Sequence, residues 1–194
     1  MRYLEFNFAA IPSVVVCGLV LSSGMAGAQA ADPEASEAGA VAVVTFQATE
    51  GFETGGKLIL APAENGIELR GKITGLSPGS HGFHIHENGA CSGAGAQGAG
   101  GHFAPDGNPH GSPDSPPSRH HAGDLGNIVA DQSGEAVVAI SDAEIGVVGP
   151  DSVLGRSIIV HAREDDLTSQ PAGAAGPRVA CGVIVALARK PEWP

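Results

Sequence analysis

The sequence has few aromatic and few basic residues. Only 4% of its 194 residues are aromatic, and 10 lysines and arginines stand against 21 aspartates and glutamates, which gives a formal net charge of −11. This charge argues against nucleic acid or an anionic membrane as a general partner, because both are negatively charged themselves. It would also repel an anionic substrate at long range, so any such substrate would have to be attracted locally.

Helical periodicity is absent as well. No segment sustains the three-to-four-residue spacing of apolar side chains that an amphipathic helix requires. The chain instead holds 29 glycines and 14 prolines, which favour turns and ordered loops. The composition therefore predicts an all-β fold with one substantial core in a single domain.

Residues 1–30 have the pattern of a secretory signal peptide. Arg2 precedes an apolar run at residues 11–21, and small residues lead to Ala30, after which we predict cleavage. The run is shorter than the roughly 20 residues that a membrane-spanning helix needs. A retained anchor stays open as an alternative, because Glu5 offsets the charge of Arg2.

Cysteine is scarce, and the three cysteines have different expected fates. Cys17 lies in the signal, and the valines before it lack the small residue usual ahead of a lipid-modified cysteine, so lipid anchoring at Cys17 is not predicted. Cys91 and Cys181 remain after cleavage. In an exported compartment this even count predicts one disulfide, worth roughly 4 to 5 kcal/mol in the chain-entropy model. Two buried free thiols are the alternative.

The domain is predicted over residues 41–194, after a flexible acidic tether at residues 31–40. Eight strand-like runs follow one another at 41–47, 57–62, 66–73, 82–86, 126–130, 136–140, 157–162 and 179–186. Asn65-Gly66 signals a hairpin, and residues 131–134 offer a longer turn between two further runs, which predicts antiparallel pairing. Eight such strands indicate a barrel or a sandwich.

Histidines gather around two loop-like stretches, residues 88–123 and 164–177. Of the eight histidines, seven fall within residues 81–121. His84 and His86 alternate with apolar residues, so both imidazoles would point to one face of a strand while the other face anchors it in the core. Long loops in a compact domain are often functional, and this clustering points to a metal site.

Six histidines and one aspartate form the candidate ligand set: His84, His86, His102, His110, His121, Asp124 and His161. This set exceeds what one four-coordinate site needs, so we predict two metals. All-imidazole ligation suits copper, and three histidines with an aspartate suit zinc. One imidazole could bridge both ions, because the ring has two nitrogens.

Five motifs resemble the copper/zinc superoxide dismutase family, in family order. They are GFHIHE at 82–87, GHFAP at 101–105, HAGDLGN at 121–127, IVH at 159–161 and GPRVACGVI at 176–184. The resemblance covers about residues 40–188 and implies an eight-stranded Greek-key β-barrel or sandwich whose two long loops form the metal site. The short second loop and the export signal look most like the bacterial periplasmic branch.

The resemblance also implies roles for individual residues. Copper would be bound by His84, His86, His102 and His161, and zinc by His102, His110, His121 and Asp124. His102 would bridge the metals, Arg178 would flank the copper channel, and Asp165 would hydrogen-bond ligands of both metals. Cys91 and Cys181 would form the disulfide that pins the long loop.

The implied reaction is disproportionation of superoxide to oxygen and hydrogen peroxide by a redox-cycling copper ion beside a structural zinc. Such an enzyme would protect an exported compartment, here a bacterial periplasm. A homodimer is compatible with the family, and neither nucleic acid nor, after signal cleavage, a membrane is expected as a partner. The alternatives are a metal-buffering protein of the same fold and a structural β-sandwich with incidental histidines.

The chain departs from the family pattern in three places. Ala90 stands where Asp, Gly or Ser is usual, and Ala174 stands where Asn is common. Residues 112–120 expand the zinc loop with three prolines and place His120 beside His121 as a rival ligand. No family motif uses His81 or His120, so both are expected to be surface or loop histidines.

Overall fold

The structure, a computed structural model, describes residues 41–187. The predicted signal peptide with Cys17, and the tether at 31–40, therefore lie outside the described residues. The elements are β1 (Ala42–Ala48), β2 (Gly55–Pro62), β3 (Ile67–Thr74), β4 (Gly79–His86), the 3-10 segments η1 (Ala94–Ala99) and η2 (Pro117–Arg119), β5 (Asp124–Ala130), β6 (Ala136–Asp142), β7 (Ser157–His161) and β8 (Arg178–Ala186). Each strand coincides with a predicted run to within three residues.

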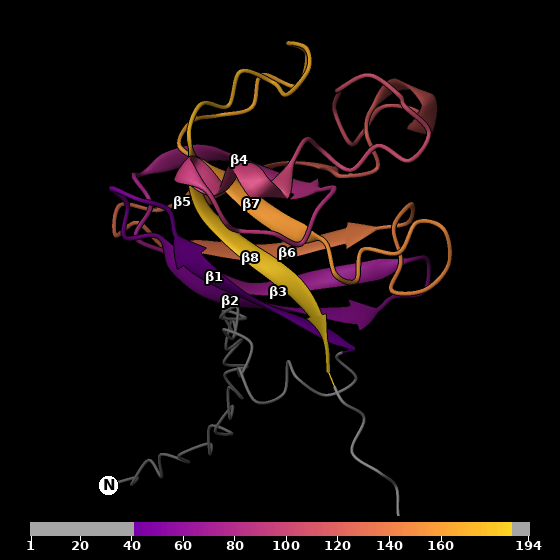
Figure 1. Cartoon of the computed structure of the whole chain (residues 1–194), viewed down its shortest axis with the longest axis horizontal. Helices are drawn as coiled ribbons and strands as arrows, with labels where there is room; N and C mark the ends of the chain where they lie inside the picture. The colour runs from indigo at the N-terminus through magenta and orange to yellow at the C-terminus, as the bar shows by residue number, and fades with distance from the viewer. Residues whose placement is uncertain (1–40, 188–194) are drawn as a thin grey trace, which may run out of the picture. The chain divides into compact units, whose positions relative to one another are not determined.

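The strands form one antiparallel sheet in the order β5-β4-β7-β8-β1-β2-β3-β6. The two end strands, β5 and β6, also contact each other, so the sheet curls into a nearly closed Greek-key barrel. Figure 1 shows β8 in yellow, lying between β7 and β1. The prediction of an eight-stranded all-β fold is confirmed.

Turn chemistry explains the β2–β3 hairpin. Gly66 has φ +85°, and a Cβ there would lie 1.9 Å from the carbonyl oxygen of Asp142, so only glycine fits. The turn at residues 131–134 also forms, closed by a 3.0 Å bond from the Gly134 amide to the Asp131 carbonyl. The strands it joins, however, are the two ends of the hydrogen-bonded order, so the pairing expected across this turn is wrong.

Strand β4 positions the site because its two faces differ. Phe83 and Ile85 are fully buried in the barrel core. His84 and His86 face the other way, yet they are buried too, since residues 87–123 and 162–177 fold over this outer face. The two loops lie on the same side of the barrel, beside β4 and β7 (Figure 1). The site is therefore a second, polar interior between the barrel and its loops.

Candidate metal centre

The first group of candidate ligands contains four imidazoles. His84 and His86 come from β4, His161 from the end of β7 and His102 from the loop, and their ligand atoms all lie within 4.8 Å of one another. One nitrogen of each ring has no protein partner: His84 Nδ1, His86 Nε2, His102 Nε2 and His161 Nε2. Buried polar atoms are rarely left unpaired, so four convergent lone pairs fit a bound cation.

The opposite nitrogen of each ring is held by a distant part of the chain. His84 Nε2 lies 2.6 Å from Asp165 Oδ2, His86 Nδ1 lies 3.0 Å from the Gly100 carbonyl, and His161 Nδ1 lies 3.1 Å from the Gly176 carbonyl. These acceptors require a proton on the nitrogen that they bind. They therefore direct the unprotonated nitrogen of each ring into the group.

The second group is built around one carboxylate oxygen. Asp124 Oδ1 lies 2.7 Å from His102 Nδ1, 3.0 Å from His110 Nδ1 and 3.1 Å from His121 Nδ1. The other oxygen accepts the backbone N–H groups of Gly111 and His121 at 3.0 and 2.9 Å, which fixes the carboxylate. Three imidazoles and one carboxylate are a donor set that suits zinc.

His102 belongs to both groups, and Asp165 connects them by a second route. The Nε2 atom of His102 belongs to the all-imidazole group, while its Nδ1 lies beside Asp124. Asp165 reaches His84 Nε2 with one oxygen and His110 Nε2, at 3.0 Å, with the other. The two groups are thus coupled through one imidazole and one carboxylate.

Burial sets the protonation of the metal-free site. It lowers the pKa of His86 to about 2, that of His161 to about 3 and that of His102 to about 4, and the neighbouring imidazoles add to the shift. Burial also acts on His110, but Asp124 and Asp165 outweigh it and raise its pKa to about 9. At neutral pH His86, His102 and His161 are therefore neutral, while His110 holds a proton.

These pKa shifts predict that the metal-free protein is most stable near pH 6.5. His86, His102 and His161 have folded pKa values below the ordinary 6.5, so the unfolded state binds more protons and stability falls as the pH drops below 6.5. His110 acts oppositely, since its contribution is present below pH 6.5 and is lost as the pH rises through about 9. Thermal unfolding of chelator-treated protein from pH 4 to 9 measures the loss of stability on both sides of pH 6.5. His110→Gln should reduce only the loss at alkaline pH.

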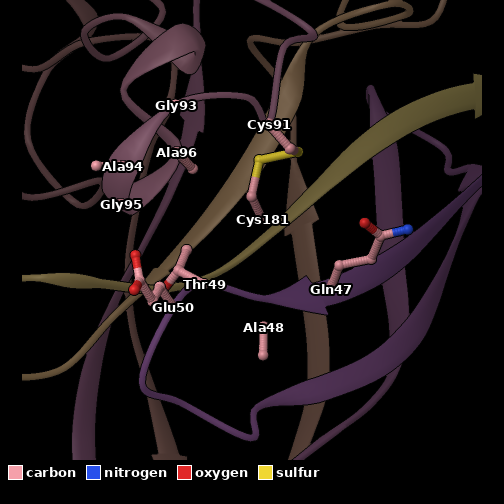
Figure 2. A pocket seen from close by; sticks show the side chains of 10 residues that line it. All are labelled: Gln47, Ala48, Thr49, Glu50, Cys91, Gly93, Ala94, Gly95, Ala96 and Cys181. Carbon is pink, nitrogen blue, oxygen red and sulfur yellow. A yellow bond between two sulfur atoms is a disulfide. The ribbon is translucent and has the colours of Figure 1, made fainter.

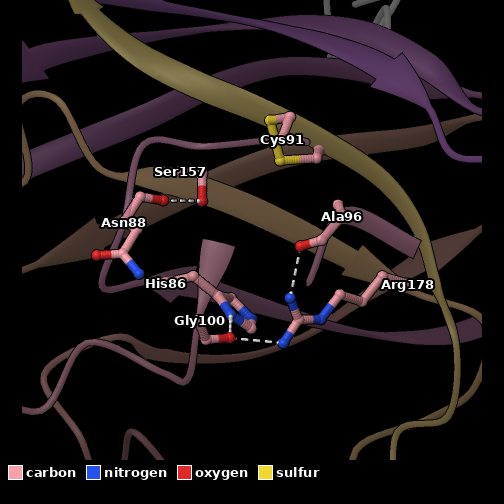
Figure 3. Close-up of a disulfide and its surroundings, with 8 residues drawn as sticks. His86, Asn88, Cys91, Ala96, Gly100, Ser157 and Arg178 are labelled. Atoms are coloured by element: carbon pink, nitrogen blue, oxygen red, sulfur yellow. Dashed lines mark hydrogen bonds between the residues drawn. A yellow bond between two sulfur atoms is a disulfide. The ribbon is translucent and has the colours of Figure 1, made fainter. Parts of the chain in front are cut away.

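Arg178 is fixed by two carbonyl groups of the covering loop. Its Nη1 donates to Ala96 at 2.7 Å and its Nη2 to Gly100 at 2.6 Å, and Gly100 also accepts from His86 (Figure 3). Arg178 and His86 therefore bond the same carbonyl oxygen, which places the guanidinium next to the first group. Ala96 has φ +52°, an unusual conformation for a residue with a side chain, and this strained turn aims its carbonyl at the guanidinium.

The predicted disulfide is present between Cys91 and Cys181 and ties the loop that carries Ala96 and Gly100 to β8. A groove of about 310 Å³ lies beside it (Figure 2). The groove is lined by Gln47, Ala48, Thr49, Glu50, Cys91, Gly93, Ala94, Gly95, Ala96 and Cys181. No member of either ligand group lines it, so this groove is separate from the metal centre.

His81 and His120 were expected to be surface or loop histidines; His120 does lie in a loop, but neither is at the surface, and His81 is part of β4. Both are buried, at 2% and 4% exposure. The two ring nitrogens of His81 lie 2.8 Å from the carbonyl oxygens of His161 and Ser77, so His81 supports the end of β7. His120 turns toward the loop after β6, where its Nε2 lies 3.2 Å from Glu144 Oε1. Both rings are buried by loops that pack over them, and no pattern in the sequence predicts this burial.

The choice between the neighbours His120 and His121 can be tested directly. Only His121 has a ring nitrogen in the second group. We expect His121→Ala to lower zinc affinity at least about tenfold, as losing a ligand or its support commonly does. His120→Ala should retain one zinc per chain. Elemental analysis after dialysis against a weak chelator distinguishes them, and retained zinc in His121→Ala would mean that the neighbour is the ligand.

Sequence reasoning missed residues that act through their hydrogen bonds. Asn127 holds Asp165 from both sides, accepting its N–H at 2.8 Å and donating to its carbonyl at 2.9 Å. Asn127 lay inside a recognised motif, which was the available signal. The carbonyls of Ala96, Gly100 and Gly176 carried no signal, because a backbone acceptor is the same at every residue.

Comparison with known proteins agrees with the two metal-ligand groups of this site. The family described as copper/zinc superoxide dismutase (SODC) matches residues 44–184. The extracellular Cu-Zn superoxide dismutase of Haemonchus contortus is 43% identical over 148 residues, which are 72% of this chain and 79% of that protein. The enzymes of the same name from Caenorhabditis elegans and Brugia pahangi are each 44% identical, over 61% and 62% of this chain and over 55% and 64% of their own lengths. The crystal structure of the clock protein EA4 matches with a TM-score of 0.68 at 35% identity, over 77% of this chain and 96% of that one.

Proposed function

The chain belongs to the copper/zinc superoxide dismutase family, and we propose that it converts two superoxide anions and two protons into oxygen and hydrogen peroxide. The observation that carries this proposal is His102. One ring nitrogen faces a group of unpaired imidazole nitrogens and the other faces a three-histidine, one-aspartate group. This arrangement suits a redox ion and a structural ion held together by one side chain.

We assign the ligands by donor chemistry. Copper is held by His84, His86, His102 and His161, and zinc by His102, His110, His121 and Asp124. When bound, copper supplies one-electron redox chemistry, while zinc supplies a fixed charge without redox chemistry. The unpaired nitrogens and the carboxylate-centred geometry support this assignment.

Two residues of the chain act on substrate and protons in this proposal. Arg178 attracts the anion locally, which offsets the repulsion of a chain with net charge −11. His102 would carry a proton at Nε2 when that nitrogen has no metal partner, because Asp124 holds the ring at its other nitrogen. Asp165 keeps the His84 and His110 rings aligned throughout.

The experiment is superoxide consumption by the mature chain loaded with copper and zinc, beside the metal-stripped chain, with metal content counted per protein. Fast turnover that disappears when copper is removed is the expected result. Stoichiometric copper and zinc with negligible turnover would overturn the proposal in favour of a metal-buffering protein.

Export and assembly are further parts of the proposal. We propose cleavage after Ala30 and export, in agreement with extracellular relatives, to a periplasm if the source is a bacterium. Within residues 41–187 there is no helix with the length and apolar character needed to cross a membrane. Mass spectrometry of the secreted chain should give Ala31 as its first residue. We also propose a homodimer, which sedimentation at micromolar concentrations would detect as twice the monomer mass.

A further inference from the structure

Gln170 makes a two-point contact with the backbone of His110. The His110 N–H donates to Gln170 Oε1 at 2.9 Å, and Gln170 Nε2 donates to the His110 carbonyl at 2.8 Å. The two residues belong to the two different loops that cover the site. One side-chain amide thus satisfies both backbone polar groups of a candidate zinc ligand, as a neighbouring strand would do.

His110 needs such support because it lies in a segment without regular structure. No helix or strand includes residues 104–116 of the described chain. The His110 ring is buried and lies between Asp124 and Asp165, each 3.0 Å away. Since Cα and ring move together, a shift of the His110 backbone would move Nδ1 out of the second group.

Gln170 is itself held in a tight turn. Asp166 accepts the backbone N–H groups of Thr168 and Ser169 at 2.9 and 2.7 Å. The Gly173 amide donates to the Ser169 carbonyl at 2.7 Å and closes the turn. A Cβ on Gly173 would lie 1.7 Å from Asp165 Oδ1 and 2.7 Å from His110 Nε2, so the turn packs directly over these side chains. The amide is therefore presented from a rigid support.

The Asn127 amide grips Asp165 in the same two-point manner. Both members of the His110–Asp165 contact are thus fixed at their backbones, Asp165 through Asn127 and His110 through Gln170. In each case one side-chain amide satisfies both the N–H and the carbonyl of a backbone that has no neighbouring strand to bond it.

We propose that Gln170 is a positioning residue for zinc: its amide holds the His110 backbone so that the ring stays aimed at the second ligand group, and it thereby slows zinc release. The proposal rests on the assignment of the second group as the zinc site under the proposed function. Gln170 touches no reacting atom and is not a catalytic residue. Because it is exposed, its replacement leaves the core intact.

The test uses Gln170→Glu, Gln170→Ala and Gln132→Glu in the full mature chain loaded with zinc alone. In Gln170→Glu the carboxylate still accepts the His110 N–H but cannot donate to the His110 carbonyl. The carboxylate oxygen that replaces the amide nitrogen and the carbonyl oxygen then repel each other. Gln132→Glu makes the same change of charge at an exposed turn outside the site. The readouts are the rate of zinc transfer to an excess of coloured chelator and the thermal midpoints of metal-free and zinc-loaded protein.

We expect zinc release to be about tenfold faster in Gln170→Glu, intermediate in Gln170→Ala and unchanged in Gln132→Glu. The metal-free midpoint of Gln170→Glu should stay within about 2 °C of the parent. Equal release rates in Gln170→Glu and Gln132→Glu would overturn the inference, as would equal losses of midpoint with and without zinc, which describe a merely structural contact. A parent chain that binds no zinc would overturn the proposed function itself, and this inference with it.

Discussion

Replacing Arg178 by glutamate is expected to slow superoxide consumption by about a hundredfold while copper and zinc stay bound. Arg178 reaches Gly100, whose carbonyl also holds His86, so its charge lies beside the first ligand group. In a chain of net charge −11 this local cation opposes the general repulsion of an anion. Metal retention should be unaffected, because the guanidinium contacts two carbonyl oxygens and no ligand nitrogen.

A matched control separates local attraction from net charge. Exposed Arg70 lies on β3 and pairs with half-buried Glu68, far along the sheet order from β4 and β7. Arg70→Glu makes the chain more negative by the same amount as Arg178→Glu, so it should lower the rate only slightly. Rising ionic strength should slow the parent enzyme and have less effect on Arg178→Glu, because screening weakens an attraction that the variant lacks.

The variant Arg178→Lys tests whether a positive charge alone maintains the rate of superoxide consumption. Lysine keeps the charge but loses the planar fork that reaches Ala96 and Gly100 together, so we expect an intermediate rate. Stopped-flow superoxide decay with metal content measured on the same samples gives all these values. Equal rates for Arg178→Glu and Arg70→Glu would contradict local attraction, and an unchanged rate in Arg178→Glu would remove Arg178 from the mechanism.

Removing both metals is expected to lower the thermal midpoint of the folded chain by more than about 10 °C. Without metal, the first ligand group has four buried imidazole nitrogens that lack a hydrogen-bond partner, and burying polar atoms without partners costs free energy. The loops over the site also contain little regular structure, so their ordering depends on the contacts of Asp124 and Asp165 with the histidines. Metals that bind only the folded state add their binding free energy to its stability.

Differential scanning calorimetry of loaded, chelator-treated and reloaded protein measures this effect. Reloading with zinc alone should recover part of the midpoint, since it restores only the second group, and copper should recover the remainder. Leu58→Ala offers a control for general destabilisation. It removes a fully buried core side chain and should lower loaded and metal-free midpoints alike. A midpoint that does not change on chelation would contradict metal binding at these two groups.

The strands and the ligand set could be read from local patterns. Strand β4 alternates Phe83 and Ile85 with His84 and His86, and this period of two is a property of the extended backbone itself. The Asn65-Gly66 turn is equally local, because it needs only a residue that tolerates positive φ. Six of the seven ligand residues lay in a recognisable motif and His110 lay between two of them, and the structure brings all seven into two groups.

The tertiary structure alone decides which nitrogen of each ring is free. His84 is turned by Asp165, His86 by the Gly100 carbonyl and His161 by the Gly176 carbonyl, and these partners come from loops without periodicity. The structure also places the ring of His121, and not that of His120, in the second group, as the motif at 121–127 implied. Such contacts join residues far apart in the chain, and their geometry depends on how the loops close over the barrel. Local propensity determined the strands, whereas long-range hydrogen bonding determined the orientation of the site.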